Sequence, residues 1–263
     1  MPASRIPLIF LLLSLLGCAP AEDVEIRFDA VLGERPLRCG DGGTVLSDLR
    51  FFVHDLEVVD ADGRAAPVRL AVVPGWQTRD LALVDLEDGT ASCLNGTADT
   101  RATVQGSVPR GDWRGLRFVL GVPAGLNHGD PLTAEGPLTR TAMHWHWRSG
   151  YKFLRAGLAR GPDGAWLHLG SARCSGVIGR LEGCAAGNRA RVVLDDFRLA
   201  SDVVGVDAGR LFAAADLDDG VVDSCQMGPD EGFCALLLEP LGLGTDGDSV
   251  APAGLFVTTR GSR

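Results

Sequence analysis

Several features that define other protein classes are scarce or missing in this sequence. Basic residues (25) are outnumbered by acidic ones (34), and the net charge is −9. This charge argues against nucleic acid as a partner, because a phosphate backbone is bound by a basic face. No apolar run approaches the roughly 20 residues that cross a bilayer as a helix. We also find no internal repeat, no G-x-S-x-G or H-E-x-x-H motif and no phosphate-binding glycine loop.

Glycine and proline, by contrast, are frequent, with 35 and 14 residues among 263. So many turn-forming residues shorten every element, which excludes coiled coils and long helical bundles. Hydrophobic residues account for 46% and charged residues for 22%, which is ordinary for a packed globular protein. We therefore expect a folded chain of short elements, organised as one domain over residues 18–263.

The first residues have the pattern of an export signal. Arg5 precedes a short apolar run over residues 6–16, and Gly17 and Cys18 follow it. This ending resembles the bacterial lipobox, in which the cysteine becomes the lipid-modified N-terminal residue. We expect residues 1–17 to be removed and Cys18 to carry lipid, which places the protein on the periplasmic side of a membrane, expected to be the outer one. An ordinary signal peptide with an incidental cysteine is the alternative.

Six cysteines then remain, and an even number in an exported chain is typical of disulfides. They are Cys39, Cys93, Cys174, Cys184, Cys225 and Cys234. Sequence alone does not select a pairing, but the simplest one joins Cys39 to Cys93 and links each of the two later, closely spaced pairs. A thiolate metal site is the alternative, and the lack of any C-x-x-C spacing weighs against it.

Short alternating runs between turn residues predict an antiparallel β-sandwich or barrel-like fold with one short helix. We expect strands over residues 25–28, 49–59, 68–73, 81–85, 102–108, 116–120, 143–147, 166–169, 190–199 and 255–259. Asp62 and Gly63 predict a hairpin turn after the long strand. Helical spacing of apolar residues predicts a helix over residues 210–217. The chain from residue 225 onward otherwise looks like loops.

The candidate chemistry lies in the histidines, since there are only five. Side chains two apart share a face of a strand, so we expect His54 on an apolar face with Phe52, Leu56 and Val58. The same rule puts His168 beside Trp166. Residues 143–147 read Met-His-Trp-His-Trp, which places His144 and His146 on one face. Met143, Trp145 and Trp147 take the other.

Imidazole and thioether donors together suit copper, particularly Cu(I). The predicted ligands are His54, His128, Met143, His144, His146 and His168. Other interpretations stay open: an inward histidine is often a hydrogen-bonded core residue, His128 also fits a turn, and a tryptophan-bearing strand can bind sugar.

The ordered motifs resemble the MbnP-like family, also called the four-Cys protein of the metallo-mystery pair. They are the stretches over residues 120–131, 136–138, 143–153 and 168–174, with the earlier 52–54 and 93–97. The resemblance runs from about residue 25 to about residue 240. Two features depart from the family pattern: histidine at both 144 and 146, and the pair Cys225 and Cys234.

This resemblance implies an exported, β-rich, often lipid-anchored protein that binds copper. Our leading hypothesis adds that the protein has no turnover of its own. It implies a partner, a di-haem c-type cytochrome peroxidase of the MauG-like class, which oxidises a tryptophan to kynurenine. Trp145 and Trp147 match the family's two spaced tryptophans, and His54, His128, His168 and Met143 match its histidine and methionine positions. A carbohydrate-binding or adhesion module and a secreted copper enzyme remain the alternative functions.

Overall fold

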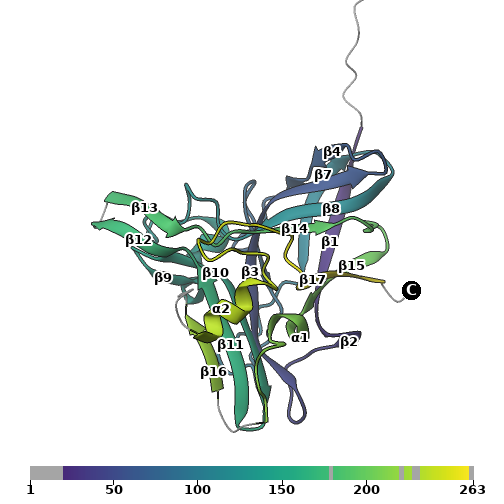
Figure 1. The fold of residues 1–263 in the computed structure, drawn as a ribbon. Helices are drawn as coiled ribbons and strands as arrows, with labels where there is room; N and C mark the ends of the chain where they lie inside the picture. Colours follow the sequence, from purple (N-terminus) through teal and green to yellow (C-terminus); the bar gives the residue numbers. More distant parts are fainter. Residues whose placement is uncertain (1–19, 178–179, 219–221, 227–231, 261–263) are drawn as a thin grey trace, which may run out of the picture.

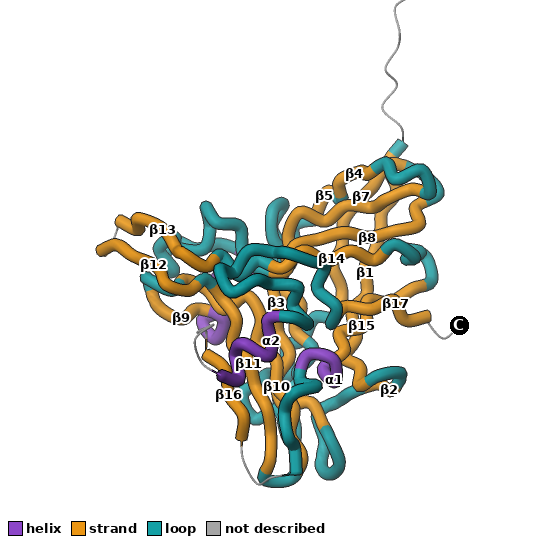
Figure 2. Tube along the Cα trace, in the orientation of Figure 1, coloured by secondary structure: helices purple, strands orange, loops and turns teal. Residues whose placement is uncertain are grey.

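The computed structural model describes residues 20–177, 180–218, 222–226 and 232–260, and strands dominate this part of the chain (Figures 1 and 2). The expected signal peptide and Cys18 lie outside the described residues. Among the helices that are described, none combines the length and the apolar character that a membrane crossing requires. The all-β prediction is confirmed, and the sheets do not close into a barrel.

The first sheet is built around the N-terminal strand. Its strand order is β17 (Phe256–Arg260), β15 (Asp202–Asp207), β1 (Ala21–Leu32), β7 (Thr103–Pro109) and β5 (Arg69–Leu70), with β2 (Arg35–Pro36) paired to β1. β1 runs antiparallel to β7 and parallel to β15. The late strand β15 therefore closes onto the beginning of the chain.

The second sheet is larger and is centred on β3 (Val45–Asp60) and β10 (Gly150–Arg160). The order is β14 (Ala190–Leu194), β8 (Trp113–Leu120), β3, β10, β11 (Asp163–Gly170) and β16 (Val222–Gln226). The short strands β4 (Ala65–Pro67) and β6 (Ala82–Asp85) pair with β3, and β9 (His144–His146) pairs with β10. The β3–β4 hairpin turns at Asp62 and Gly63, as expected, and Gly63 has a φ of 82°.

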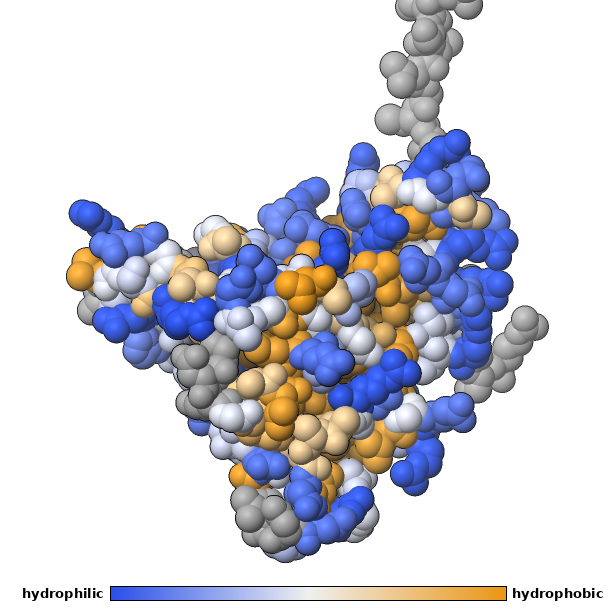
Figure 3. Space-filling view, viewed as in Figure 1, coloured by the Kyte–Doolittle hydropathy of each residue, from blue (hydrophilic) through white to orange (hydrophobic). Residues whose placement is uncertain are grey.

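A separate hairpin and four short helices complete the described structure. The hairpin, β12 (Ala172–Val177) and β13 (Arg180–Ala186), forms its own two-stranded sheet and extends away from the main body in Figure 1. The α-helices are α1 (Ala208–Leu211) and α2 (Gly232–Leu238), and the 3₁₀ helices are η1 (Gly136–Thr139) and η2 (Thr141–Met143). Apolar side chains gather around α2 in the space-filling view (Figure 3), where Leu236 is 54% exposed.

The two large sheets enclose the main core. Phe28 of the first sheet packs edge-on against Phe51 and Phe118 of the second, with ring centroids 5.5 and 6.0 Å apart. Phe256 of β17 closes the cluster against Phe51 and Phe118. The face of the second sheet that meets this core is called the inner face below. The opposite face, called the outer face, is covered by loops and carries a smaller apolar cluster that includes Phe52, Met143 and Tyr151.

A β-bulge in β3 changes which residues share a face. Asp55 has a φ of 49°, and the pairing of β3 with β8 shifts register between His54 and Glu57. The extra residue reverses the alternation. Leu56 therefore points into the main core together with Val58, while Phe52 lies in the outer cluster. The prediction that His54 shares its face with Leu56 and Val58 is wrong for this reason.

Other expected elements are corrected in extent. The helix expected over 210–217 is α1, which starts earlier because the Asp207 carboxylate accepts hydrogen bonds from Gly209 N and Arg210 N, and which ends at Leu211. The strands expected over 68–73 and 190–199 are shorter, and Met143 belongs to η2 rather than to a strand. The sequence does not predict several other elements, among them β2, β10, β12, β13, β15, β16, η1 and α2.

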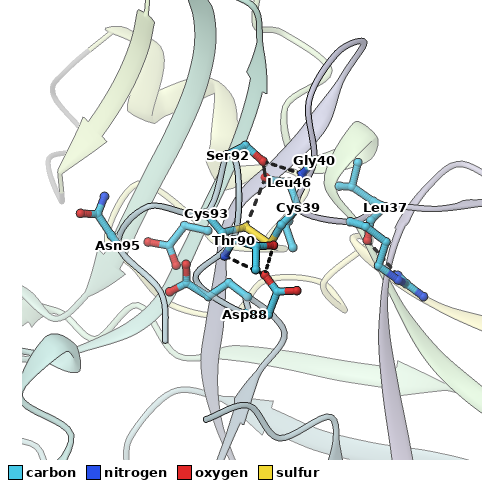
Figure 4. The surroundings of a disulfide bond; sticks show 12 residues. Leu37, Cys39, Gly40, Leu46, Asp88, Thr90, Ser92, Cys93 and Asn95 are labelled. Atoms are coloured by element: carbon cyan, nitrogen blue, oxygen red, sulfur yellow. Dashed lines mark hydrogen bonds between the residues drawn. A yellow bond between two sulfur atoms is a disulfide. The ribbon is translucent and has the colours of Figure 1, made fainter. Parts of the chain in front are cut away.

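The simplest disulfide pairing is confirmed in full. Cys39 is bonded to Cys93, Cys174 to Cys184 and Cys225 to Cys234. The first bond joins the loop before β3 to the loop after β6. Beside it the Ser92 hydroxyl donates to the Leu46 carbonyl of β3 and accepts from Gly40 N (Figure 4). A bridge between residues 54 positions apart restricts the unfolded chain, which favours the folded state.

The packing makes a prediction about Phe51, whose side chain is fully buried between the sheets. We expect Phe51→Ala to lower the free energy of unfolding by about 3–5 kcal/mol, because it removes ring contacts and leaves a cavity. Urea denaturation measures this change. Leu132→Ala is the control, since Leu132 is 93% exposed and its loss is expected to cost under about 0.5 kcal/mol. Equal losses in the two variants would contradict the assignment of the core.

Candidate metal and tryptophan site on the outer face

The outer face of β10 and β11 carries a row of adjoining aromatic rings, which meet at an angle. His168 of β11 lies between two indoles: its ring centroid is 4.8 Å from that of Trp166 and 6.1 Å from that of Trp145. Trp166 and His168 adjoin because they are two apart on one strand, as the sequence predicts. Trp145 comes from β9, which pairs with the beginning of β10. Residues distant in sequence thus meet at one imidazole.

The imidazole of His168 is held in its neutral form. Burial is the main cause, and the nearby cations Arg155, Lys152 and Arg50 add to it, so that the pKa of His168 falls to about 3. Neither ring nitrogen of His168 receives a hydrogen bond from the residues that the structure describes. A neutral imidazole with an uncommitted lone pair is the form that binds a metal ion.

Two cations of β10 hold the segment that bears Trp145. The ammonium of Lys152, the chain's single lysine, donates to the carbonyls of Ala142 at 3.0 Å and His144 at 3.5 Å, and lies 5.7 Å from the Trp145 ring centroid. Arg155 donates to the Ala142 carbonyl as well, at 3.3 Å. Burial, with Arg155 nearby, lowers the pKa of Lys152 to about 8. These bonds anchor β9 to the sheet.

The side chains of the remaining residues of the Met-His-Trp-His-Trp segment lie in different surroundings. Met143 is fully buried in the outer apolar cluster, and the half-buried His144 ring contacts Tyr151 at 5.1 Å. Burial, with the nearby cation Lys152, lowers the pKa of His144. His146 is exposed and stacks on the Trp147 ring, which also lies under Arg148.

His54 is buried in β3 near the bulge. Its Nδ1 is 3.0 Å from a carboxylate oxygen of Asp55, and its Nε2 has no hydrogen-bond partner among the described residues. Burial lowers the pKa of His54, although Asp55 opposes the change. This histidine thus has one nitrogen directed to a carboxylate and one left free in the interior.

His128 lies elsewhere, against the β12–β13 hairpin. Its Nε2 is 3.4 Å from Cys184 Sγ and its Nδ1 is 3.4 Å from the Trp147 carbonyl oxygen. Burial lowers the pKa of His128. Together with the disulfide sulfurs of Cys174 and Cys184, it forms the only group in the described ranges whose three potential donor atoms lie within 4.8 Å of one another.

The structure therefore does not gather the predicted ligands around one point. His168 pairs with Arg155 on β10, and Arg155 pairs with Arg50 on β3. His54 is four residues further along β3. Two strand spacings of about 5 Å and a rise of about 13 Å separate His168 from His54, which is too far for one ion to bind both. What the structure does bring together is His168 with Trp145.

Sequence reasoning missed a buried charged cluster beside this site. Asp48 forms ion pairs with Arg50 and Arg155, and Glu87 pairs with Arg50. Asp48 and Arg50 are two residues apart on β3, so both side chains lie on the outer face of the sheet. Two opposite charges two residues apart in an otherwise apolar strand could have predicted these ion pairs, because a charged residue is rarely buried unless it is paired.

The carboxyl groups of this cluster predict a pH dependence of stability. Burial raises the pKa of Asp85 to about 7 and that of Glu87 to about 8. On these two carboxyl groups the folded protein holds protons that the unfolded chain releases above about pH 4, so their contribution to the free energy of unfolding falls as the pH rises from about 4 to about 8.

We expect Glu87→Gln to flatten this dependence, because the amide has no proton to lose. Urea denaturation at about pH 5 and about pH 8 measures the difference. The exposed Glu22→Gln is the control and should retain the slope of the unchanged protein. Parallel stability curves for Glu87→Gln and the unchanged protein would contradict the assignment.

Comparison with known proteins agrees with the fold and the motifs. The family model MbnP matches residues 21–227. Among solved structures, MbnP from Methylosinus trichosporium superposes with a TM-score of 0.77 at 25% sequence identity, covering 92% of this chain and 100% of its own. No curated protein sequence matches. The family match spans every strand of both large sheets except β17, and the chain belongs to the MbnP family.

Proposed function

We propose that this chain is an exported copper-binding protein whose copper site is formed at His168 and Trp145. The observation that carries the proposal is the neutral imidazole of His168, which has free ring nitrogens and lies between two indole rings. Imidazole suits copper, and the two indole rings beside His168 limit solvent access to the metal. Bound copper would supply a soft, redox-active cation, while the protein supplies a donor fixed on a strand.

The second part of the proposal is that Trp145 is oxidised to kynurenine. Two equivalents of peroxide cleave the indole to N-formylkynurenine and release two waters, and hydrolysis then releases formate. The product carries an aniline nitrogen and a ketone in place of the indole. At residue 145 these groups adjoin His168, whereas Trp147 stacks on His146 and Arg148. Trp145 is therefore the better candidate of the two.

We assign the oxidation to a partner enzyme, the di-haem c-type cytochrome peroxidase expected from the family. Trp145 is half-buried, so part of its ring is within reach of a docked protein. Export and lipid anchoring through Cys18 complete the proposal. The three disulfides support an oxidising compartment, because such bonds are rare in reducing ones.

Copper titration tests the site. We expect His168→Ala to weaken copper binding about tenfold or more, because it removes the proposed imidazole ligand. His54→Ala is the matched control: it deletes a buried histidine of the same sheet that lies too far away to contribute. Competition with a chromophoric copper chelator measures both affinities. An unchanged copper affinity in His168→Ala would contradict the proposed site. Quenching of tryptophan fluorescence by sugar in the absence of metal would favour the carbohydrate-binding alternative.

Mass spectrometry tests the modification. After coexpression with the di-haem partner, the peptide from Thr141 to Arg148 should carry kynurenine at residue 145. Trp145→Phe should abolish the change, and Trp147→Phe should keep it, because only the first ring adjoins His168. Two unmodified tryptophans in this peptide, with active partner present, would contradict the proposal.

A further inference from the structure

His128 and the disulfide of the projecting hairpin form a second group of potential donors. Nε2 of His128 lies 3.4 Å from Cys184 Sγ, and the donor atoms of His128, Cys174 and Cys184 all lie within 4.8 Å of one another. All three side chains are half-buried. The sulfurs are joined to each other at present and so cannot act as thiolates.

The hydrogen bonds of Asn127 fix the tautomer of His128. Asn127 Oδ1 accepts from Tyr151 N at 2.9 Å, so the other amide atom, Nδ2, is the one that faces His128. Because an amide nitrogen donates, Nε2 of His128 accepts and carries a lone pair. The proton resides on Nδ1, which faces the Trp147 carbonyl. The lone pair thus lies on the side of the ring that faces the Cys184 sulfur.

This disulfide is the most accessible of the three. Cys174 and Cys184 are both partly exposed, whereas each of the other bonds contains at least one cysteine that is under 5% exposed: Cys93, Cys225 and Cys234. The accessible bond joins two neighbouring strands of a hairpin that forms its own sheet. Breaking it leaves the main core and the other two links in place.

We propose that reduction of Cys174–Cys184 creates a thiolate–imidazole site for one Cu(I) ion, formed by both sulfurs and His128 Nε2. A dithiol reductant supplies two electrons and two protons: the S–S bond breaks, two thiols form and the reductant becomes a disulfide. Binding of Cu(I) then releases the thiol protons. Thiolates are soft ligands that favour this oxidation state.

The present geometry needs little change to hold the ion. Donors bound at about 2.3 Å to one ion lie up to about 4 Å apart. His128 Nε2 is already 3.4 Å from Cys184 Sγ, and the two sulfurs separate by side-chain rotation once their bond is broken. The ion takes the place of the Asn127 amide hydrogen on the imidazole lone pair. This site shares no donor with His168 and does not depend on the function proposed above.

An anaerobic Cu(I) titration of the full chain tests the inference. The protein is treated with a dithiol under conditions in which alkylation labels only Cys174 and Cys184. We expect the reduced protein to bind one equivalent of Cu(I) more than the oxidised protein, as measured by competition with a chromophoric Cu(I) chelator. His128→Ala should weaken this additional equivalent about tenfold or more. His168→Ala should leave it unchanged, which separates this site from the one proposed above.

The double variant Cys174→Ala, Cys184→Ala is the control, since it keeps the other two disulfides under the same treatment. It should bind no additional Cu(I). An additional equivalent in this variant, equal binding by the oxidised and reduced proteins, or unchanged affinity in His128→Ala would each overturn the inference.

Discussion

The burial of β3 on both of its faces is the constraint on which the rest of this structure depends. One set of its side chains, including Phe51, fills the space between the two sheets, and the other set, including Phe52, supports the loops of the outer face. A strand in this position cannot slip by one residue, because slippage would exchange the two sets. The bulge at Asp55 changes the alternation, and it allows the remainder of β3 to return its apolar side chains to the main core.

The outer face shows how this fixed strand positions chemistry. β3 orients β10 by pairing, and β10 orients both β11 and β9. His168 and Trp145 meet because each is registered on a neighbour of the same strand. Buried ion pairs join Asp48 to Arg50 on β3 and to Arg155 on β10, and Arg155 donates to the Ala142 carbonyl through its other terminal nitrogen. The charges thus help to place the segment and keep His168 neutral at the same time.

Some of this could be predicted from the sequence and some could not. The strands that alternate, such as the one containing Phe52, were visible, as was the adjacency of Trp166 and His168. The central strand β10 was not, because it is buried on both faces and lacks a period of two along Gly150–Arg160. Local pairing of the later cysteines was foreseeable from their spacing. The bulge at Asp55 was not, since a positive φ at an aspartate has no clear sequence signal. Separation of His54 from His168 follows from strand order, which no single sequence reveals.

The hydrogen bonds from Lys152 and Arg155 to the backbone of the segment ahead of Trp145 have a consequence for encounter with other molecules. A loop that must be ordered during complex formation reduces affinity by the entropy that it loses. Here that entropy is already lost when the chain folds. The surface around Trp145 is already ordered before a macromolecule docks on it, so association is expected to approach a rigid-body event.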